Sequence, residues 1–350
     1  MIVVISAIIV LGIIVFVHEL GHFTVAKIFG VGVEKFSIGY PPTMVSKKIG
    51  ETEYCIGWIP FGGYVKLVGE EPGAETIDSS KSFAQKHPLI RIAVLVAGPL
   101  MNIVLGIFLL WLVFAFVGES VPHFDTPRIG SVIPGMPADK AGILPQDLII
   151  SIDGDSVEDW DEMAGLIHRR PNQPVIIVVQ RGDSIFEVQC SPQARNIETE
   201  NGDTVWGMIG IVPTTEQHYI GPVAAIWRSV GASIGIVSAV LSFIWKLLVG
   251  SASLSEVGGP VMIAQMAGDS ARMGIWQFLI FIAALSINLA VLNLFPIPIL
   301  DGGQILFTAI EGVRGRKISE KVMAAIQQAS IAFLLAIMLL VTIKDVLRLL

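Results

Sequence analysis

Long apolar stretches constrain this chain more than any other feature of its sequence. Residues 2–17 contain no charged side chain. Helix-compatible sequence continues to Phe29, which gives about 40 Å of helix at 1.5 Å per residue. Because the hydrocarbon core of a bilayer is about 30 Å thick, this segment is long enough to cross it. No basic region follows Met1 and no small-residue cleavage site ends the stretch, so we interpret it as a retained span and not as a cleaved signal peptide.

Three further stretches have the length of a span: 89–117, which Gly98-Pro99 interrupts, 275–300 and 322–343. Of the 350 residues, 53% are hydrophobic and only 15% are charged, which argues against a single soluble domain. The net charge of −7 and the absence of Lys/Arg runs exclude a nucleic-acid partner, because such a protein needs a basic face. The sequence thus predicts a polytopic α-helical membrane protein with four transmembrane helices, whose partners include the lipid bilayer.

A fifth apolar segment, residues 223–249, is long enough to span but carries Arg228 and Lys246. The polar clusters near residue 20 and residue 301 both follow spans, and an extra crossing here would place them on opposite sides of the bilayer. We therefore expect this segment to lie along the interface or to re-enter.

Basic residues set the expected orientation of the chain. Arg314, Arg316, Lys317 and Lys321 lie between the third and fourth spans. Short loops rich in Lys and Arg favour the cytoplasm. This places residues 30–88 in the cytoplasm as well, and the segment after the second span outside.

Residues 125–192 change character and predict a small α+β domain, with short apolar strands, Pro/Gly/Asp turns and one helical stretch at Asp159–Arg169. The segment resembles a PDZ domain, with Gln146 standing where that family usually has Gly. The resemblance implies that a peptide or a substrate ectodomain adds as a strand in a groove between Ile129–Val132 and the helix, with Ile129 and Val132 as binding residues. The alternative is a spacer that binds nothing. The resemblance rests on Ile129-Gly130-Ser131-Val132, Pro137-Ala138, Ala141-Gly142-Ile143, Asp147–Gly154 and Val178–Gly182.

His18-Glu19-Leu20-Gly21-His22 predicts a metal site at the end of the first span. Positions i and i+4 share one face of a helix, so two imidazoles can take adjacent corners of a zinc tetrahedron. Glu19 lies beside them, where a carboxylate can take a proton from a water molecule that the metal activates and pass it to a leaving amine. Ionisable groups at the end of an apolar helix usually mark a functional site. The alternative is that these residues only mark the headgroup end of the span.

Two imidazoles leave zinc in need of a third protein ligand, and Asp301 is the best candidate. It ends the sequence Asn293-Leu-Phe-Pro-Ile-Pro-Ile-Leu-Asp301-Gly-Gly, in which two prolines break the helix and free the chain to turn a carboxylate inward. Taken alone, Asp-Gly would equally suit an ordinary turn.

Together these motifs resemble the bacterial site-2 protease family, intramembrane zinc metalloproteases of the RseP type (peptidase family M50). The likeness also rests on Ala97-Gly98-Pro99-x-x-Asn102 and Pro60-Phe-Gly-Gly-Tyr-Val-Lys66. Enteric members carry two tandem PDZ domains, whereas this chain has room for one. The resemblance implies zinc held by His18, His22 and Asp301, Glu19 as the base, Asn293 holding the substrate strand, and a place in the bacterial inner membrane with the zinc site toward the cytoplasm.

Alternating residues between the first two spans predict short strands at Val33–Gly39 and Tyr54–Trp58, followed by another at Phe61–Leu67. By resemblance they form a small membrane-associated β-sheet near the zinc, whose edge around Gly62 and Gly63 pairs with an unwound substrate. The chemistry gives a reason, because a helical peptide bond must be extended before it can lie beside the metal. A hairpin with only a packing role is the alternative.

The function expected from these features is an intramembrane zinc endopeptidase that cuts single-span membrane proteins, such as anti-sigma factors or signal-peptide remnants. Two rivals are a membrane zinc protease that acts on lipidated or soluble tails, and a catalytically dead PDZ scaffold or chaperone. The intact Glu19 argues against a scaffold. The expected segments are 1–29 (first span with HExxH), 30–88 (cytoplasmic β region), 89–118 (second span), 119–215 (extracytoplasmic PDZ domain and flanks), 216–271 (interfacial or re-entrant), 272–303 (third span with LDG), 304–321 (basic cytoplasmic loop) and 322–350 (fourth span).

Overall fold

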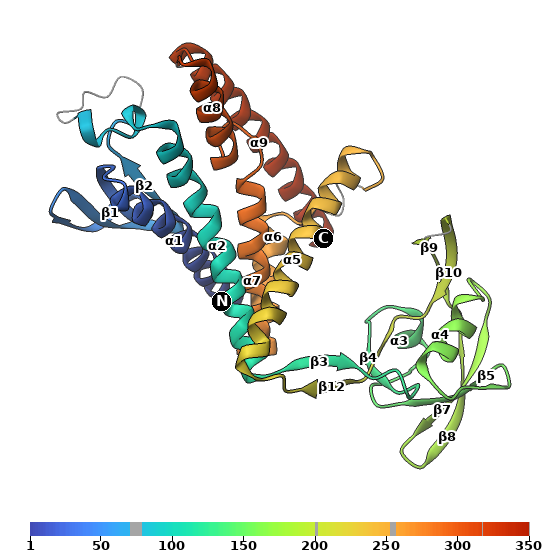
Figure 1. The fold of residues 1–350 in the computed structure, drawn as a ribbon. Helices are drawn as coiled ribbons and strands as arrows, with labels where there is room; N and C mark the ends of the chain where they lie inside the picture. Colours follow the sequence, from blue (N-terminus) through green and yellow to red (C-terminus); the bar gives the residue numbers. More distant parts are fainter. Residues whose placement is uncertain (71–78, 200–201, 253–256, 317, 350) are drawn as a thin grey trace. The chain divides into compact units, whose positions relative to one another are not determined.

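The computed structural model describes residues 1–350 except 71–78, 200–201, 253–256, 317 and 350. Parts of the expected segments that fall on these gaps, including Lys317, lie outside the described residues. The chain divides into two compact units (Figure 1). The first contains residues 1–117 and 221–350, and the second contains residues 118–220. The insert expected at 119–215 falls within the second unit.

The first unit is built from helices and one β-hairpin (Figure 1). Proline at the first position of α2 and of α6 suits a helix start, where the backbone N–H has no partner in the helix. Despite Pro99, α2 is continuous. The helices are α1 (Ile2–Ile28), α2 (Pro88–Phe116), α5 (Gly221–Leu248), α6 (Pro260–Met273), α7 (Ile275–Asn293), α8 (Asp301–Arg314) and α9 (Glu320–Leu349), with short 3₁₀ turns at Ser79–Lys81 and Phe83–Gln85.

Among the described residues, five helices are long and apolar enough to cross a membrane by length and composition: α1, α2, α5, α7 and α9. The expected count of four is therefore not confirmed, because α5 joins the set. Trp227 and Trp245 on α5 are 75% and 65% exposed. They lie five helical turns apart on one face, about 27 Å along the axis, which is close to the thickness of a bilayer's hydrocarbon core.

The helices α5 and α7 start at the same end of the bundle. The indole N–H of Trp111, near the end of α2, donates to the Pro222 carbonyl at the start of α5 (3.0 Å). Phe116, the last residue of α2, stacks on Trp276 at the start of α7, with ring centroids 6.4 Å apart. The starts of α5 and α7 thus both lie beside the end of α2.

An apolar cluster joins α1, α2 and α7 in the middle of the bundle. Its buried members include Ile14 of α1, Leu110 of α2 and Ile287 of α7. At Gly106, a Cβ atom would lie 2.5 Å from the Ile287 side chain, so the absence of a side chain lets α2 and α7 approach closely. This packing fixes the helices that carry the polar residues described below.

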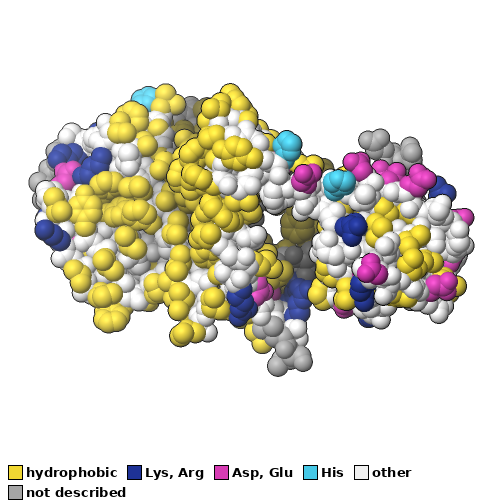
Figure 2. Space-filling model, turned by 90° about the horizontal axis from the view of Figure 1, so that it is seen from below, with side chains coloured by type: hydrophobic (Ala, Val, Ile, Leu, Met, Phe, Trp, Pro, Cys, Tyr) yellow, Lys and Arg dark blue, Asp and Glu magenta, His cyan; other side chains and the backbone are white. Residues whose placement is uncertain are grey.

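Strands β1 (Val33–Ile49) and β2 (Thr52–Leu67) form an antiparallel two-stranded sheet, longer than the strands expected here. The hairpin is anchored at its base, where Val33 and Leu67 pack with Ala26 of α1 and Phe83. Farther out it exposes large apolar side chains, including Trp58 at 63%. Figure 2 shows that apolar side chains cover most of the visible face of the first unit, as a lipid-facing surface requires.

The segment after α7 departs from expectation. The helix α7 ends at Asn293, and Asp301 is the first residue of α8, so the LDG sequence does not lie on the third span. Most of the loop expected at 304–321 is the helix α8. Two prolines stop α7, and the Asp301 carboxylate suits the N-terminus of a new helix, where the helix dipole favours negative charge.

The second unit is a small α+β domain. Its centre is a four-stranded sheet in the order β6-β5-β7-β8, and its core includes Ile149, Met163 and Ile177. The helix α4 spans Trp160–His168, close to the expected 159–169, and Asp159 caps it by accepting a hydrogen bond from the Glu162 N–H (2.8 Å). The other elements are β3 (Glu119–Pro122), β4 (Ile129–Val132), α3 (Pro137–Lys140), β5 (Leu148–Ile152), β6 (Asp155–Ser156), β7 (Val175–Arg181), β8 (Ser184–Cys190), β9 (Gln193–Thr199), β10 (Gly202–Met208), β11 (Ile211–Pro213) and β12 (Thr215–His218).

Candidate metal centre

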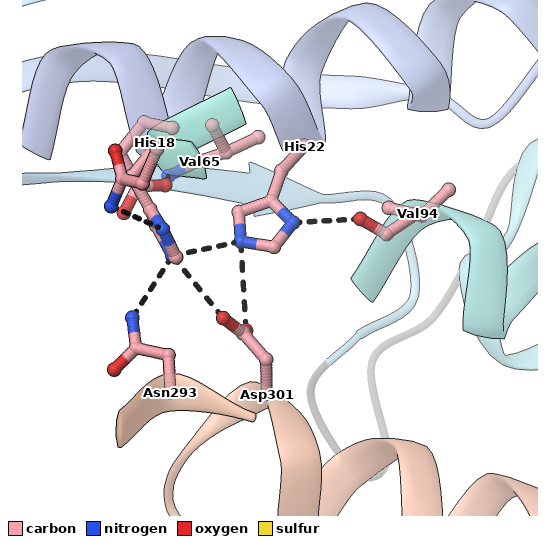
Figure 3. A network of polar contacts seen from close by, with 8 residues as sticks. His18, His22, Val65, Val94, Asn293 and Asp301 are labelled. Carbon is pink, nitrogen blue, oxygen red and sulfur yellow. Dashed lines mark hydrogen bonds and ion pairs between the residues drawn. The ribbon is translucent and has the colours of Figure 1, made fainter. Parts of the chain in front are cut away.

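His18, His22 and Asp301 converge on one point in the first unit (Figure 3). Their candidate ligand atoms all lie within 4.8 Å of one another, and no other such group of three occurs in the described part of the chain. His18 Nε2 is 3.2 Å from Asp301 Oδ2, and His22 Nε2 is 3.5 Å from Asp301 Oδ1. The three side chains are only 9–17% exposed. The structure therefore brings together the three residues that the sequence predicts as ligands.

Two glycines let α1 and α2 approach each other beside these histidines. A Cβ at Gly21, between the two histidines, would overlap the Ala97 carbonyl oxygen of α2. A Cβ at Gly98 would overlap His22 Nε2 and lie 2.9 Å from His18 Cε1. From the sequence, Gly98 could be noted as an interruption of the second span and as part of a family motif. Its contact with the histidines could not be predicted, because that contact depends on how the two helices pack.

The chain between α7 and α8 folds tightly back and turns Asp301 toward the histidines. A Cβ at Gly302 would overlap the Leu294 carbonyl, and one at Gly303 would overlap the Ile297 carbonyl. Asn293, the last residue of α7, points its amide nitrogen at His18 Nε2 from 3.5 Å. The proline-containing segment thus places a carboxylate and an amide beside the same imidazole.

The arrangement suits a cation. His22 Nδ1 lies 2.7 Å from the Val94 carbonyl oxygen. Because a carbonyl oxygen can only accept a hydrogen bond, Nδ1 carries the proton and the other ring nitrogen, Nε2, carries a lone pair. That nitrogen lies 3.1 Å from His18 Nε2. Asp301 Oδ2 is buried and has no hydrogen-bond partner. Lone pairs from two imidazoles and a carboxylate meeting in a buried space are the donor set of a catalytic zinc site, which needs three protein ligands.

Glu19 lies next to these residues and contacts the hairpin. Its Oε2 accepts a hydrogen bond from the Val65 N–H of β2 (3.0 Å). The Glu19 Cγ atom lies 3.7 Å from where a Cβ on Gly63 would be, so the backbone of β2 passes directly beside it. Gly62 has φ +150°, and a side chain there would overlap the Tyr40 ring. The structure thus places Gly63 beside Glu19, and the preceding residue, Gly62, against Tyr40.

The profile of peptidase family M50 matches residues 6–337. The chain belongs to peptidase family M50. This is a family of site-2 proteases. A Clostridium perfringens protein named "Putative zinc metalloprotease" is 34% identical over 348 residues, 98% of each chain. A Rhizobium meliloti protein that is also named a putative zinc metalloprotease is 33% identical over 328 residues, 88% of this chain and 86% of the other.

This M50 member is accordingly a zinc metalloendopeptidase and, with its apolar helices, a multi-pass membrane protein. Part of the chain is also similar to the solved PDZ domain of an SdrC-like protein from Listeria innocua. That likeness has 29% identity and a TM-score of 0.21, and it covers 27% of this chain and 99% of that one. The score is too low to identify the fold of the second unit.

The second unit has a cavity beside α4, and its lining does not include Ile129 or Val132, the binding residues expected from the sequence. Ile129 is fully buried in the core, and Val132 pairs with Ile211, so neither lines a groove beside α4. The cavity, of about 240 Å³, lies between α4 and residues 207–213. Among the described residues, β11 pairs with β4 in a two-stranded sheet, and the other edge of β11 has no strand partner. The strand beside α4 therefore comes from the C-terminal end of the domain. The local sequence that could have indicated this position is Gly207-Met-Ile-Gly210.

Proposed function

We propose that this M50 protease is an intramembrane endopeptidase that hydrolyses peptide bonds of single-span membrane proteins, among them anti-sigma factors or signal-peptide remnants. The observation that carries the proposal is the convergence of His18, His22 and Asp301 within 4.8 Å. The two histidines lie on α1, and Asp301 follows α7; both of these helices are long and apolar enough to cross a membrane. A site built on such helices is suited to substrates that also lie in the bilayer.

In the proposed reaction, His18, His22 and Asp301 hold the zinc, and Glu19 acts as the base. When bound, zinc lowers the pKa of a water molecule and polarises the peptide carbonyl. The Val65 N–H holds Glu19 through Oε2, which leaves Oε1 to take the proton and pass it to the nitrogen of the leaving amine. The Asn293 amide, 3.5 Å from His18, is placed to donate a hydrogen bond to the substrate backbone.

The hairpin gives the substrate a surface to pair with. A peptide bond inside a helix is shielded by the neighbouring turns, so the substrate must unwind before it reaches Glu19. The strand β2 passes beside Glu19 at Gly63, and the lack of a side chain there lets its backbone lie close to Glu19. We assign Gly62 and Gly63 to substrate binding for this reason.

The second unit is proposed to be a PDZ domain that binds a peptide or a substrate ectodomain. Its support is the cavity between α4 and residues 207–213 and the free edge of β11, to which an extended peptide can add as a strand. The proposed location is the bacterial inner membrane, with this unit outside and the zinc site toward the cytoplasm.

Purified wild type and Glu19→Gln test the proposal. We expect about one zinc ion per chain in both proteins, because Glu19 is not a ligand. We expect cleavage of single-span model substrates to fall by at least 10²-fold in the variant, since general acid–base catalysis contributes about 10²–10⁴-fold. Equal cleavage by both proteins would exclude Glu19 as the base. Cleavage of soluble peptides but of no membrane substrate would favour the rival protease, which acts on soluble tails.

A further inference from the structure

The two histidines of the metal centre differ in what holds their second ring nitrogen. His22 Nδ1 donates to the Val94 carbonyl of α2, which fixes the tautomer and the plane of that ring. Metal-binding histidines usually have such a partner, which leaves the opposite nitrogen free for the metal. The structure offers His18 a different neighbour on the same helix, the side-chain amide of Asn102 (3.3 Å from Nδ1).

Asn102 is completely buried, and its side chain is only partly satisfied. Its amide nitrogen, Nδ2, faces His18 Nδ1, while its carbonyl oxygen, Oδ1, is buried and has no hydrogen-bond partner. A buried polar atom without a partner is costly and asks for an explanation. The amide nitrogen and oxygen have nearly the same shape, so the two can exchange places when the side chain turns about its Cβ–Cγ bond.

Zinc binding by His18 determines which of the two orientations of the Asn102 amide is favourable. His18 Nε2 faces Asp301 and His22, and it can bind the metal only if it carries no proton. The proton of the neutral ring must then be on Nδ1, which turns Nδ1 into a donor. An amide N–H facing that donor would be repelled, whereas the carbonyl oxygen of Asn102 would accept its hydrogen bond.

We propose that Asn102 is a positioning residue for the metal centre: with zinc bound, its Oδ1 accepts a hydrogen bond from Nδ1–H of His18 and thereby orients that ring and fixes its tautomer. The inference rests on the proposed role of His18 as a ligand. Asn102 does for His18 what the Val94 carbonyl does for His22, so α2 orients both imidazoles of α1.

The position of Asn102 is itself fixed by α7. The main-chain carbonyl oxygen of Asn102 accepts a hydrogen bond from the Ser286 hydroxyl (2.9 Å), and Ser286 is fully buried. One turn farther along α2, Gly106 lies against Ile287 of α7. Ser286 therefore provides a matched control, because replacing it disturbs the backbone of residue 102 but leaves the side chain facing His18.

The test compares zinc affinity in the full chain, purified in detergent, by competition with a chelator. Asn102→Leu keeps the size of the side chain and removes its hydrogen bond, and we expect zinc to bind about 10–100-fold more weakly, the usual cost of losing such a partner. Asn102→Asp keeps an acceptor in either orientation, and its affinity should stay within about threefold of the wild type. Cobalt substituted for zinc should give an altered visible absorption spectrum in Asn102→Leu and a wild-type spectrum in Asn102→Asp.

Three results would overturn the inference. If Asn102→Asp weakened zinc binding as much as Asn102→Leu does, the Asn102 amide would have to act as a donor. A loss in Ser286→Ala equal to that in Asn102→Leu would mean that helix packing sets the affinity. Full affinity in Asn102→Leu would mean that His18 needs no partner. The proposed function fails separately, if the wild type binds no zinc or if His18→Ala binds zinc normally.

Discussion

At the scale of single residues, Gly98 controls the space in which His22 can bind a metal. A methyl group at this position would overlap His22 Nε2 and lie 2.9 Å from His18 Cε1. To relieve the overlap, the His22 ring would have to rotate and break its hydrogen bond to the Val94 carbonyl. Even a methyl group at position 98 would therefore disturb the two histidines directly.

We predict that Gly98→Ala weakens zinc binding by at least 10-fold, because it displaces one ligand and disturbs the orientation of another. Gly12→Ala is the matched control, since a Cβ at Gly12 meets no atom within 4 Å. Zinc content after dialysis against a graded series of chelator concentrations measures the effect. Equal zinc content in the two variants would show that the helices can separate without disturbing the site.

The three converging residues His18, His22 and Asp301 could be predicted from the sequence, but the residues that pack against them could not. The spacing of His18 and His22 fixes their common face on any helix, and the prolines before Asp301 indicate a break that frees its carboxylate. Asn102 and Gly98 act through the packing of α2 against α1 and α7. No local pattern contains that packing, so the sequence analysis could quote these residues but could not give them a role.

At the scale of elements, Gln146 stands at a turn that suits glycine. Its φ is +74°, in the left-handed region that costs an L-residue with a side chain about 1 kcal/mol. The neighbouring turn uses glycine, Gly142, with φ +79° and no atom within 4 Å of a Cβ. Gln146 thus adopts a left-handed backbone conformation at a position where glycine would be unstrained.

We predict that Gln146→Gly stabilises the second unit by about 0.5–1 kcal/mol and that Gly142→Ala destabilises it by a similar amount. Cys190 reports on this unit alone, because it is buried in its core and burial raises the pKa of its thiol to about 11. Its labelling by a maleimide as urea is increased gives the free energy of opening in the full chain, with Cys55 replaced by serine. Changes of the same sign in both variants would contradict the argument.

Asp147 and Arg181 join the turn before β5 to the end of β7. Burial alone would raise the pKa of Asp147, but hydrogen bonds from Arg181 (2.7 and 2.8 Å) and the Leu144 N–H outweigh it and hold this pKa below its ordinary value. A carboxyl whose pKa is lowered by folding stabilises the fold above its unfolded pKa, so this contribution is present at pH 7 and is lost as the pH falls below about 4.

We predict that Asp147→Asn lowers the free energy of opening of the second unit by about 2 kcal/mol at pH 7. The figure is less than the 3–5 kcal/mol of a fully buried pair, because the Arg181 side chain is 39% exposed. The same Cys190 labelling measures it, with Asp183→Asn in an exposed turn as the control. An unchanged urea midpoint in Asp147→Asn would mean that Arg181 finds another partner at no cost.

The cavity beside α4 could not be located from the sequence, because it depends on an element far from the helix along the chain. The strand β4 matched the PDZ pattern, and the helix that follows in the sequence, α4, was predicted almost residue for residue. The strand beside α4 is β11, which arrives about forty residues later and pairs with β4 on its far side. Such a long-range pairing leaves no periodic signal near either strand.

At the scale of the whole molecule, the order of spans predicts that the β1–β2 hairpin and residues 118–220 lie on opposite sides of the membrane. One crossing by α2, 29 residues long, would separate the hairpin, which follows the zinc motif, from the segment that begins at residue 118. The basic residues after α7 favour the cytoplasm for the hairpin. We therefore predict that residues 118–220 lie outside.

Cysteine labelling tests this arrangement, and both native cysteines, Cys55 and Cys190, are buried and give little background. We introduce one exposed cysteine at a time, Lys48→Cys in the hairpin or Asp183→Cys in the β7–β8 turn. A maleimide that cannot cross membranes should label Asp183→Cys when it is applied from outside and Lys48→Cys only in inverted vesicles. The reverse pattern would invert the orientation. Labelling of both from one side would require an even number of crossings between the hairpin and the second unit, and would remove α2 from the set of spans.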